Sequence, residues 1–327
     1  MSLQTPHVQA CIASHTTLAY IVRGTVVAIY CIVTIFFNCL QIVVTQRVTS
    51  FSDNTRILMT SLALSDIGVG FLAVSSLFIS VFVESYTIPS WLCHVAFAWF
   101  YTCTSRSVVD LMMLSVDRFV AVTKPLRYPT ILPQHRVKLI TLILWVFIVT
   151  LGVTTSLINT VEFNECVSLC VPKLPRSVTD SVLIFIMYYV LPLVIIFGMN
   201  MKLCQLSSMH VKKIQASIPL SEIVENSVSS TVSRRIVQRQ PTNGNRKSAY
   251  VVAFVTLGFA LTWIAYYVMI LVSTFGGPEA SEWIQFTVVW LALSNSWLNV
   301  IIYALFYRAF RETAHKFIVR CGRCFQP

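Results

Sequence analysis

Long apolar stretches alternate with shorter polar segments along this chain. Seven stretches are long enough for a helix to cross a hydrocarbon layer about 30 Å thick, which takes about 20 mostly apolar residues. They are residues 18–44, 57–82, 91–122, 137–158, 181–203, 250–274 and 283–306. Their length and uniform hydrophobicity exclude a membrane β-barrel, whose strands alternate apolar and polar residues. The pattern therefore predicts an all-α membrane protein built as a bundle of seven transmembrane helices.

The polar segments divide the chain into three parts. Residues 1–17 form a short N-terminus, residues 18–306 the transmembrane domain and residues 307–327 a cytoplasmic tail. Residues 206–248 are the one long connection inside the domain, and we expect them to form the third cytoplasmic loop. In the tail, one helical face carries Phe310, Ala314, Phe317 and Ile318, with basic residues on another face. This predicts a short amphipathic helix in the cytoplasmic interface.

Composition and charge indicate whether the chain contacts lipid or nucleic acid. The chain is 56% hydrophobic and only 11% charged, whereas soluble domains have about 25% charged residues. The net charge of +11 raises the alternative of a nucleic-acid partner. The basic residues are scattered over short segments instead of forming one patch, so we expect a lipid bilayer and no nucleic acid. The outer segments hold only Lys173 and Arg176, which places the N-terminus outside the plasma membrane of a multi-pass protein.

One charged residue lies in the middle of the second span, where charge is costly and usually functional. This residue is Asp66, and other spans offer it the polar partners Asn38, Ser107, Asn295, Ser296 and Asn299. One interpretation is a hydrated polar cluster around a neutral carboxyl group. The other is a set of oxygen ligands for a small cation such as Na+. Spacing alone favours the first interpretation.

Two further polar groups belong to the third span. Arg106 and Asp110 are four residues apart and so share a helix face, which predicts a buried ion pair near Trp145. At the cytoplasmic end, Asp117 precedes Arg118. A charge-assisted bond between these two would hold Arg118 in a resting state, and a released Arg118 would reach toward a cytoplasmic partner.

Landmarks in all seven spans, in order, resemble the rhodopsin-like (class A) G-protein-coupled receptors over nearly the full chain. They are Asn38, Leu62-Ala63-Leu64-Ser65-Asp66, Cys93, Asp117-Arg118-Phe119, Trp145, Pro192, Phe259-Ala260-Leu261-Thr262-Trp263 and Asn299-Val300-Ile301-Ile302-Tyr303. The resemblance implies a receptor that transmits an extracellular ligand signal to heterotrimeric G proteins. It implies no enzyme, and the sequence shows no nucleophile–base set or metal-ligand cluster.

The resemblance also implies an outward-facing ligand cavity. The residues expected to line it are Phe100, Tyr101, Thr104, Tyr188, Trp263, Tyr266, Tyr267 and Trp290. This set is aromatic and uncharged, although aromatic faces can still hold a cation. Phe100 stands where amine receptors of the family carry an Asp, so a cationic amine anchored at that contact is disfavoured. The ligand itself stays unknown at this stage.

Other roles are implied by position in the family. The residues implied to couple to the G protein or to change conformation on activation are Asp117, Arg118, Leu126, Trp263, Asn299 and Tyr303. The residues Asp66, Ser107, Asn295, Ser296 and Asn299 resemble an intact sodium pocket, which raises the cation interpretation above the hydrated cluster. No other cofactor is expected.

The cysteines leave alternatives open. Cys93 resembles one half of a disulfide to the second outer loop, whose partner is Cys170 or Cys166, and Cys11 is a candidate partner for the cysteine left over. Cys321 and Cys324 follow the amphipathic helix. Palmitoylation and two reduced surface thiols are equally compatible with these positions.

The sequence departs from the family at four positions. Ala265 and Val300 replace prolines of the sixth and seventh spans, Asn200 replaces a tyrosine of the fifth, and Asn245 stands where some members carry an acid. Without the prolines we expect straighter helices, or bends made by another route such as a π-bulge. These departures keep open a non-signalling or decoy receptor. A transporter or channel would predict inverted repeats or a polar track, and neither is visible.

Overall fold

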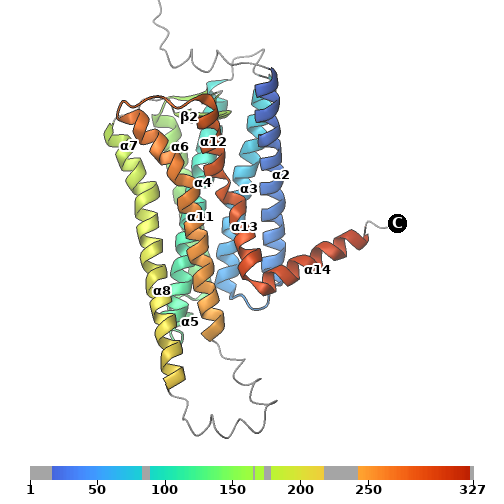
Figure 1. The fold of residues 1–327 in the computed structure, drawn as a ribbon, viewed down its shortest axis with the longest axis vertical. Helices are drawn as coiled ribbons and strands as arrows, with labels where there is room; N and C mark the ends of the chain where they lie inside the picture. Colours follow the sequence, from blue (N-terminus) through green and yellow to red (C-terminus); the bar gives the residue numbers. More distant parts are fainter. Residues whose placement is uncertain (1–16, 83–88, 165, 173–177, 217–241, 325–327) are drawn as a thin grey trace, which may run out of the picture.

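Long helices standing side by side form the body of the protein in the computed structural model, which describes residues 17–82, 89–164, 166–172, 178–216 and 242–324 (Figure 1). In chain order they are α2 (Thr17–Arg47), α3 (Asp53–Phe82), α4 (Ser90–Thr123), α6 (Gln134–Ile158), α7 (Val178–Phe185) with α8 (Leu191–Ala216), α11 (Thr242–Thr274), and α12 (Glu282–Leu293) with α13 (Asn295–Phe306). The short helix α5 (Tyr128–Ile131) connects α4 to α6, and α14 (Arg308–Cys324) leaves the bundle at an angle. We call this end of the bundle the α14 end.

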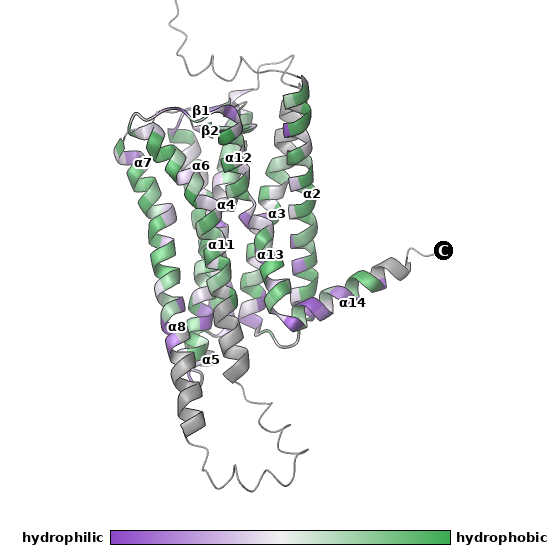
Figure 2. Ribbon diagram, viewed as in Figure 1, coloured by the Kyte–Doolittle hydropathy of each residue, from purple (hydrophilic) through white to green (hydrophobic). Residues whose placement is uncertain are grey.

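Hydrophobic residues dominate the long helices of the bundle (Figure 2). Within the described residues, five helical segments are long and apolar enough to cross a bilayer, and α12 with α13 forms a sixth if the bent pair is one span. The remaining helix, α4, has 34 residues and turns its charged Arg106 and Asp110 wholly inward. Large side chains such as Leu142 and Phe147 of α6 are exposed on the outside, where lipid and not water is the favourable solvent. The predicted all-α membrane bundle is confirmed.

Two of the predicted single helices are interrupted. In the fifth, the π-helical turn η1 (Ile186–Val190) separates α7 from α8, just before Pro192. In the seventh, α12 and α13 meet at Ser294 at an angle of 45°. The sixth, α11, runs as one continuous α-helix. Both sequence alternatives therefore occur: α11 continues without its proline, whereas the seventh bends without one.

The bend in the seventh helix is stabilised by donors from α2. A break in a helix leaves backbone carbonyl groups without their usual partners. The Tyr30 hydroxyl donates to the Leu293 carbonyl at 2.7 Å, and Asn38 Nδ2 donates to the Ser296 carbonyl at 2.9 Å. Side chains of the first helix thus supply bonds that hold the bend.

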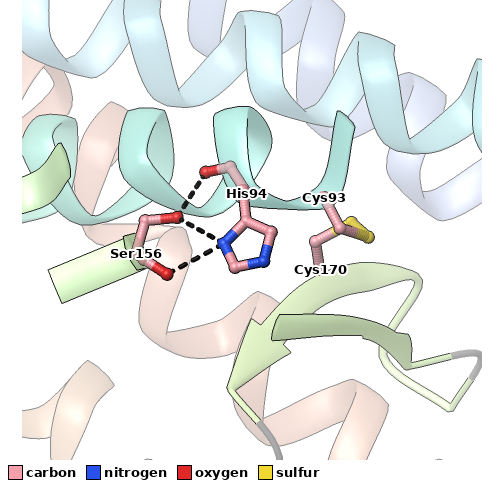
Figure 3. Close-up of a disulfide and its surroundings, with 4 residues drawn as sticks. All are labelled: Cys93, His94, Ser156 and Cys170. Atoms are coloured by element: carbon pink, nitrogen blue, oxygen red, sulfur yellow. Dashed lines mark hydrogen bonds between the residues drawn. A yellow bond between two sulfur atoms is a disulfide. The ribbon is translucent and has the colours of Figure 1, made fainter. Parts of the chain in front are cut away.

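A two-stranded antiparallel hairpin covers the other end of the bundle, which we call the hairpin end. Strand β1 (Val161–Asn164) pairs with β2 (Leu169–Pro172), with Phe163 opposite Cys170. The disulfide predicted for Cys93 joins it to Cys170, at an S–S distance of 2.03 Å (Figure 3). Cys166 is also disulfide-bonded, and its expected partner Cys11 lies outside the described residues. The hairpin was not predicted from the sequence.

A second link next to the disulfide joins α4 to α6. The Ser156 hydroxyl donates to the His94 carbonyl at 2.7 Å, and His94 Nδ1 lies 2.8 Å from the Ser156 carbonyl oxygen (Figure 3). These bonds and the disulfide fix the start of α4 to both of its neighbours. The hairpin is therefore held firmly over the interior of the bundle.

The predicted amphipathic helix is α14. Phe310 and Ala314 are buried in a core cluster with Tyr303 of α13, and the Arg47 guanidinium carbon lies 4.6 Å from the Phe317 ring centre. Exposed Ile318 lies farther along the helix. These contacts thus fasten α14 to the bundle as far as Phe317. Cys321 and Cys324 belong to its last turns, and their side chains lie outside the described residues.

Candidate functional site

A cavity of about 560 Å³ lies between the hairpin and the middle of the bundle. Of the residues predicted to line it, the structure brings together Phe100, Tyr101, Thr104, Tyr188, Trp263, Tyr266 and Tyr267. Trp290 does not line it. Its indole nitrogen donates to the Val167 carbonyl at 3.1 Å, and its ring packs edge-on against Tyr30 at 5.1 Å between ring centres. The loop between β1 and β2 thus draws Trp290 into a structural core.

The cavity also contains residues that the sequence analysis missed. Asp180 of α7 is the one charged side chain among the described lining residues and was not in the predicted set. Val171 and Pro172 of the hairpin and Asn159 at the end of α6 also line the wall. Val171 and Pro172 carry no local sequence signal for this position, because the fold of the hairpin brings them there.

Trp263 lies between this cavity and the polar centre of the bundle. It lines the large cavity together with Thr104. The same two residues line a void of about 10 Å³, whose other walls include Ser107, Asn295 and Ser296. A rearrangement of Trp263 would therefore reach both compartments.

Polar side chains from three helices meet at Asp66, which is fully buried. The Ser107 hydroxyl donates to Asp66 Oδ1 at 3.0 Å, and Asn299 Nδ2 lies 3.5 Å from Oδ2. Among the described residues, the buried oxygens Asn295 Oδ1 and Asn299 Oδ1 have no hydrogen-bond partner. One carboxylate with neutral oxygens fits the oxygen coordination that a small hard cation prefers. The donor set therefore suits Na+.

The predicted ion pair of the third helix exists and is fully buried. Arg106 Nη2 lies 2.5 Å from Asp110 Oδ1, and neither side chain is exposed. The Ser61 hydroxyl donates to Asp110 Oδ2 at 2.9 Å, and Trp145 Nε1 donates to Ser61 at 2.9 Å. The Arg106 guanidinium also lies 5.3 Å from the Trp145 ring centre. Three helices thus surround the pair, as the sequence suggested.

A second polar network lies at the α14 end of α4. Arg118 Nη2 donates to Asp117 Oδ2 at 2.7 Å and also contacts Thr55 of α3. The Tyr128 hydroxyl of α5 donates to Asp117 Oδ1 at 2.5 Å. Burial and the hydrogen bond to Asp117 raise the pKa of Tyr128, which keeps its donor proton in place. Arg118 is thus held against α3, in the arrangement expected of a resting state, while Leu126 is almost fully exposed.

The predicted switch residue Tyr303 and the family departure Asn200 are both buried. Tyr303 packs against Phe310 at 6.3 Å between ring centres. Asn200, which replaces the family tyrosine, donates from Nδ2 to the Thr256 hydroxyl at 3.3 Å and so links α8 to α11. The side chain of Asn245 lies outside the described residues.

Comparison with known proteins gives one consistent family. Residues 37–303 match the family model described as the seven-transmembrane receptor, rhodopsin family. The chain is 26% identical to the histamine H2 receptor of Canis lupus familiaris, over 86% of this chain and 74% of that receptor. It is 26% identical to trace amine-associated receptor 13c of Danio rerio (96% and 89% covered) and 23% identical to adenosine receptor A2b of Gallus gallus (91% and 88% covered).

These relatives are receptors, and they support neither an enzyme nor the alternatives of a decoy, a transporter or a channel. The match spans most of the chain and agrees with the bundle, its apolar outer surface and the Cys93–Cys170 disulfide. The chain therefore belongs to the rhodopsin family of seven-transmembrane receptors and is a multi-pass plasma-membrane protein that signals through G proteins.

Proposed function

We propose that this receptor binds a small aromatic molecule in the cavity under the hairpin and, in response, releases Arg118 to a G protein. The observation that carries the proposal is the position of Trp263, which lines both the cavity and the void beside the Asp66 cluster. A volume of about 560 Å³ lies in the range of small-molecule sites. The relatives are named for histamine, trace amines and adenosine, all of them small molecules.

The proposed topology places the hairpin end outside the cell. The cationic side chains Arg56, Arg118 and Lys138 lie at the α14 end of their helices. The positive-inside rule assigns that end to the cytoplasm. The N-terminus would then be extracellular, and Arg118 would face the G protein.

The proposed activation mechanism depends on whether the ligand binds the resting or the signalling state more tightly. A ligand shifts the receptor only if it binds the signalling state more tightly than the resting state. Contact with Trp263 would let it favour a different packing of α11 against α4, and the Arg118–Asp117 bond of the resting state would then open. The Asn200–Thr256 bond joins α8 to α11 and would have to adapt in the same step.

Na+ is proposed to bind the resting state. Asp66 would supply the charge, and Ser107, Asn295, Ser296 and Asn299 the neutral oxygens. The ion would balance the carboxylate and hold α3, α4 and α13 together. Because coupling between two binding sites is reciprocal, Na+ would lower the affinity for an activating ligand by the same factor that the ligand lowers the affinity for Na+.

A basic nitrogen on the ligand is the second candidate feature, and Asp180 is the observation that favours it. The carboxylate lines the cavity about two helical turns before Tyr188 along α7 and η1. It offers an amine a partner that Phe100 does not. Asp180→Asn should then weaken the response to amines and spare that to neutral aromatic compounds.

The test is a screen of small aromatic compounds, amines included, with nucleotide exchange on a panel of Gα subunits as the readout. Active compounds are then applied to Thr104→Phe, which narrows the cavity, and to Thr150→Phe, the same change at an exposed position of α6. We expect loss of the response only in Thr104→Phe. Equal responses in both variants would place the ligand elsewhere.

A further inference from the structure

A second large cavity lies on the outside of the bundle, between α3 and α6 toward the α14 end. Its volume is about 470 Å³. The residues that carry the argument are Arg56, Leu64, Lys138 and Trp145, with Asp53 at the rim. Leu64 and Lys138 are exposed, so the groove faces the medium that surrounds the bundle. We call it the α3–α6 groove.

The groove changes character along its length. Arg56 and Lys138 lie near the first turns of α3 and α6, whereas Leu64 and Trp145 lie seven or eight residues farther on. At 1.5 Å per residue this separation is about 10–12 Å. One end of the groove is therefore charged and close to the membrane surface, and the other is apolar and within the hydrocarbon. An amphiphile with a charged head has this same profile.

The net charge of the groove indicates the charge of the lipid head group that it would bind. Arg56 Nη1 lies 3.3 Å from Asp53 Oδ1, and its Nη2 donates to the Val48 carbonyl at 3.0 Å, so its charge is partly balanced. Lys138 forms no ion pair with a described residue. Two cations and one carboxylate leave the groove with a charge of about +1, which attracts an anionic head group.

We propose that one anionic phospholipid of the cytoplasmic leaflet occupies the α3–α6 groove, with its phosphate at Lys138 and Arg56 and its glycerol and upper acyl chains against Leu64 and Trp145. A sterol would fill the apolar end but would bring only one neutral hydroxyl to the charged end, which would leave the positive charge unbalanced. The site is separate from the ligand cavity, so the proposal stands or falls independently of the ligand.

A lipid in the groove would contact residues that are bonded to the buried Arg106–Asp110 ion pair. Ser61 and Trp145 line the groove and are bonded to each other, and Ser61 also donates to Asp110. Asp110 and Arg106 belong to α4, where the next residue after Arg106 is Ser107, the partner of Asp66. Lipid in the groove would therefore stabilise the side of α4 that faces away from the ligand cavity.

The experiment counts bound lipid on the purified full-length receptor by native mass spectrometry. Phosphatidylserine, phosphatidylcholine and cholesterol are titrated in turn onto wild type and onto Lys138→Gln. We expect one tightly bound phosphatidylserine in wild type, and an affinity lower by about fivefold after loss of one lysine charge. Arg136→Gln, which removes a charge two residues away but outside the groove, serves as the matched control and should bind like wild type.

A second pair of variants tests the apolar end without altering charge. Leu64→Trp fills the groove from its exposed side, and Leu142→Trp places the same bulk on the exposed surface of α6 outside it. Only Leu64→Trp should reduce phosphatidylserine binding. The proposal is overturned if Lys138→Gln binds phosphatidylserine as wild type does, if Leu64→Trp has no effect, or if phosphatidylcholine or cholesterol binds as tightly.

Discussion

Replacing Asp110 with Asn is expected to destabilise the receptor strongly, because it leaves a buried guanidinium without its counter-charge. Arg106 is fully buried and lies 2.5 Å from the Asp110 carboxylate. After the substitution, its remaining contacts would be the Ser61 hydroxyl at 3.0 Å and the Trp145 ring at 5.3 Å. Breaking a buried ion pair by removing one partner costs about 3–5 kcal/mol. At roughly 2–4 °C per kcal/mol, the unfolding temperature should fall by roughly 6–20 °C.

The structure supplies a convenient assay for this change. Cys31 and Cys103 are free and buried, so a thiol-reactive fluorescent dye reaches them only as the receptor unfolds. Heating the purified receptor with the dye gives the unfolding temperature. Glu312→Gln, which breaks the exposed Arg308–Glu312 pair on α14, is the surface control and should leave that temperature unchanged, because exposed pairs contribute little.

Two further variants test whether Arg106 and Asp110 stabilise the receptor as a pair. Arg106→Met should cost less than Asp110→Asn, because an isolated carboxyl group can take up a proton whereas a guanidinium stays charged. The double variant Arg106→Met with Asp110→Leu should unfold near the wild-type temperature, since apolar replacement of a whole buried pair is often neutral or stabilising. If the double variant lost as much stability as the single variants Arg106→Met and Asp110→Leu lose together, the pair would not be coupled and this argument would be wrong.

Three more predictions follow from single contacts. Asp66→Asn should abolish the effect of Na+ on ligand affinity, measured by competition binding with and without NaCl; persistent sodium dependence would exclude the proposed ion site. Tyr30→Phe removes the bond to the Leu293 carbonyl and should cost about 1 kcal/mol, seen as a lower unfolding temperature, whereas an unchanged temperature would mean that the bend needs no donor there. Phe310→Ala empties a fully buried site and should cost about 3–5 kcal/mol; limited proteolysis should then cleave α14 faster, and cleavage at the wild-type rate would show that Phe310 does not anchor it.

Much of the bundle was predictable because lipid imposes a simple rule on the sequence. Each spanning helix must satisfy its own backbone and needs about 20 apolar residues, so the seven stretches appear in the hydrophobic pattern. The pair Arg106 and Asp110 was also readable, since a spacing of four places both on one face and an intramembrane charge needs a partner. The buried position of Asp66 followed from the same argument.

The bend at Ser294 and the hairpin were not predictable in this way. No proline marks the bend, because the bonds that hold it come from Tyr30 and Asn38, more than 250 residues away in the chain. Trp290 was misjudged for a related reason, and Asp180 was left out of the expected lining. The Trp290 indole is bonded to Val167 of the hairpin, and local sequence carries little information about a loop that is fixed by a disulfide to a distant helix.

The central claim is that binding under the hairpin is transmitted to Arg118. It is tested most directly by nucleotide exchange on purified G protein with the receptor in nanodiscs, using a compound from the screen. Wild type and the surface variant Arg136→Ala should accelerate exchange when the compound is added, whereas Arg118→Ala should bind the compound and fail to accelerate exchange. Compound-stimulated exchange by Arg118→Ala at the wild-type rate would contradict the account.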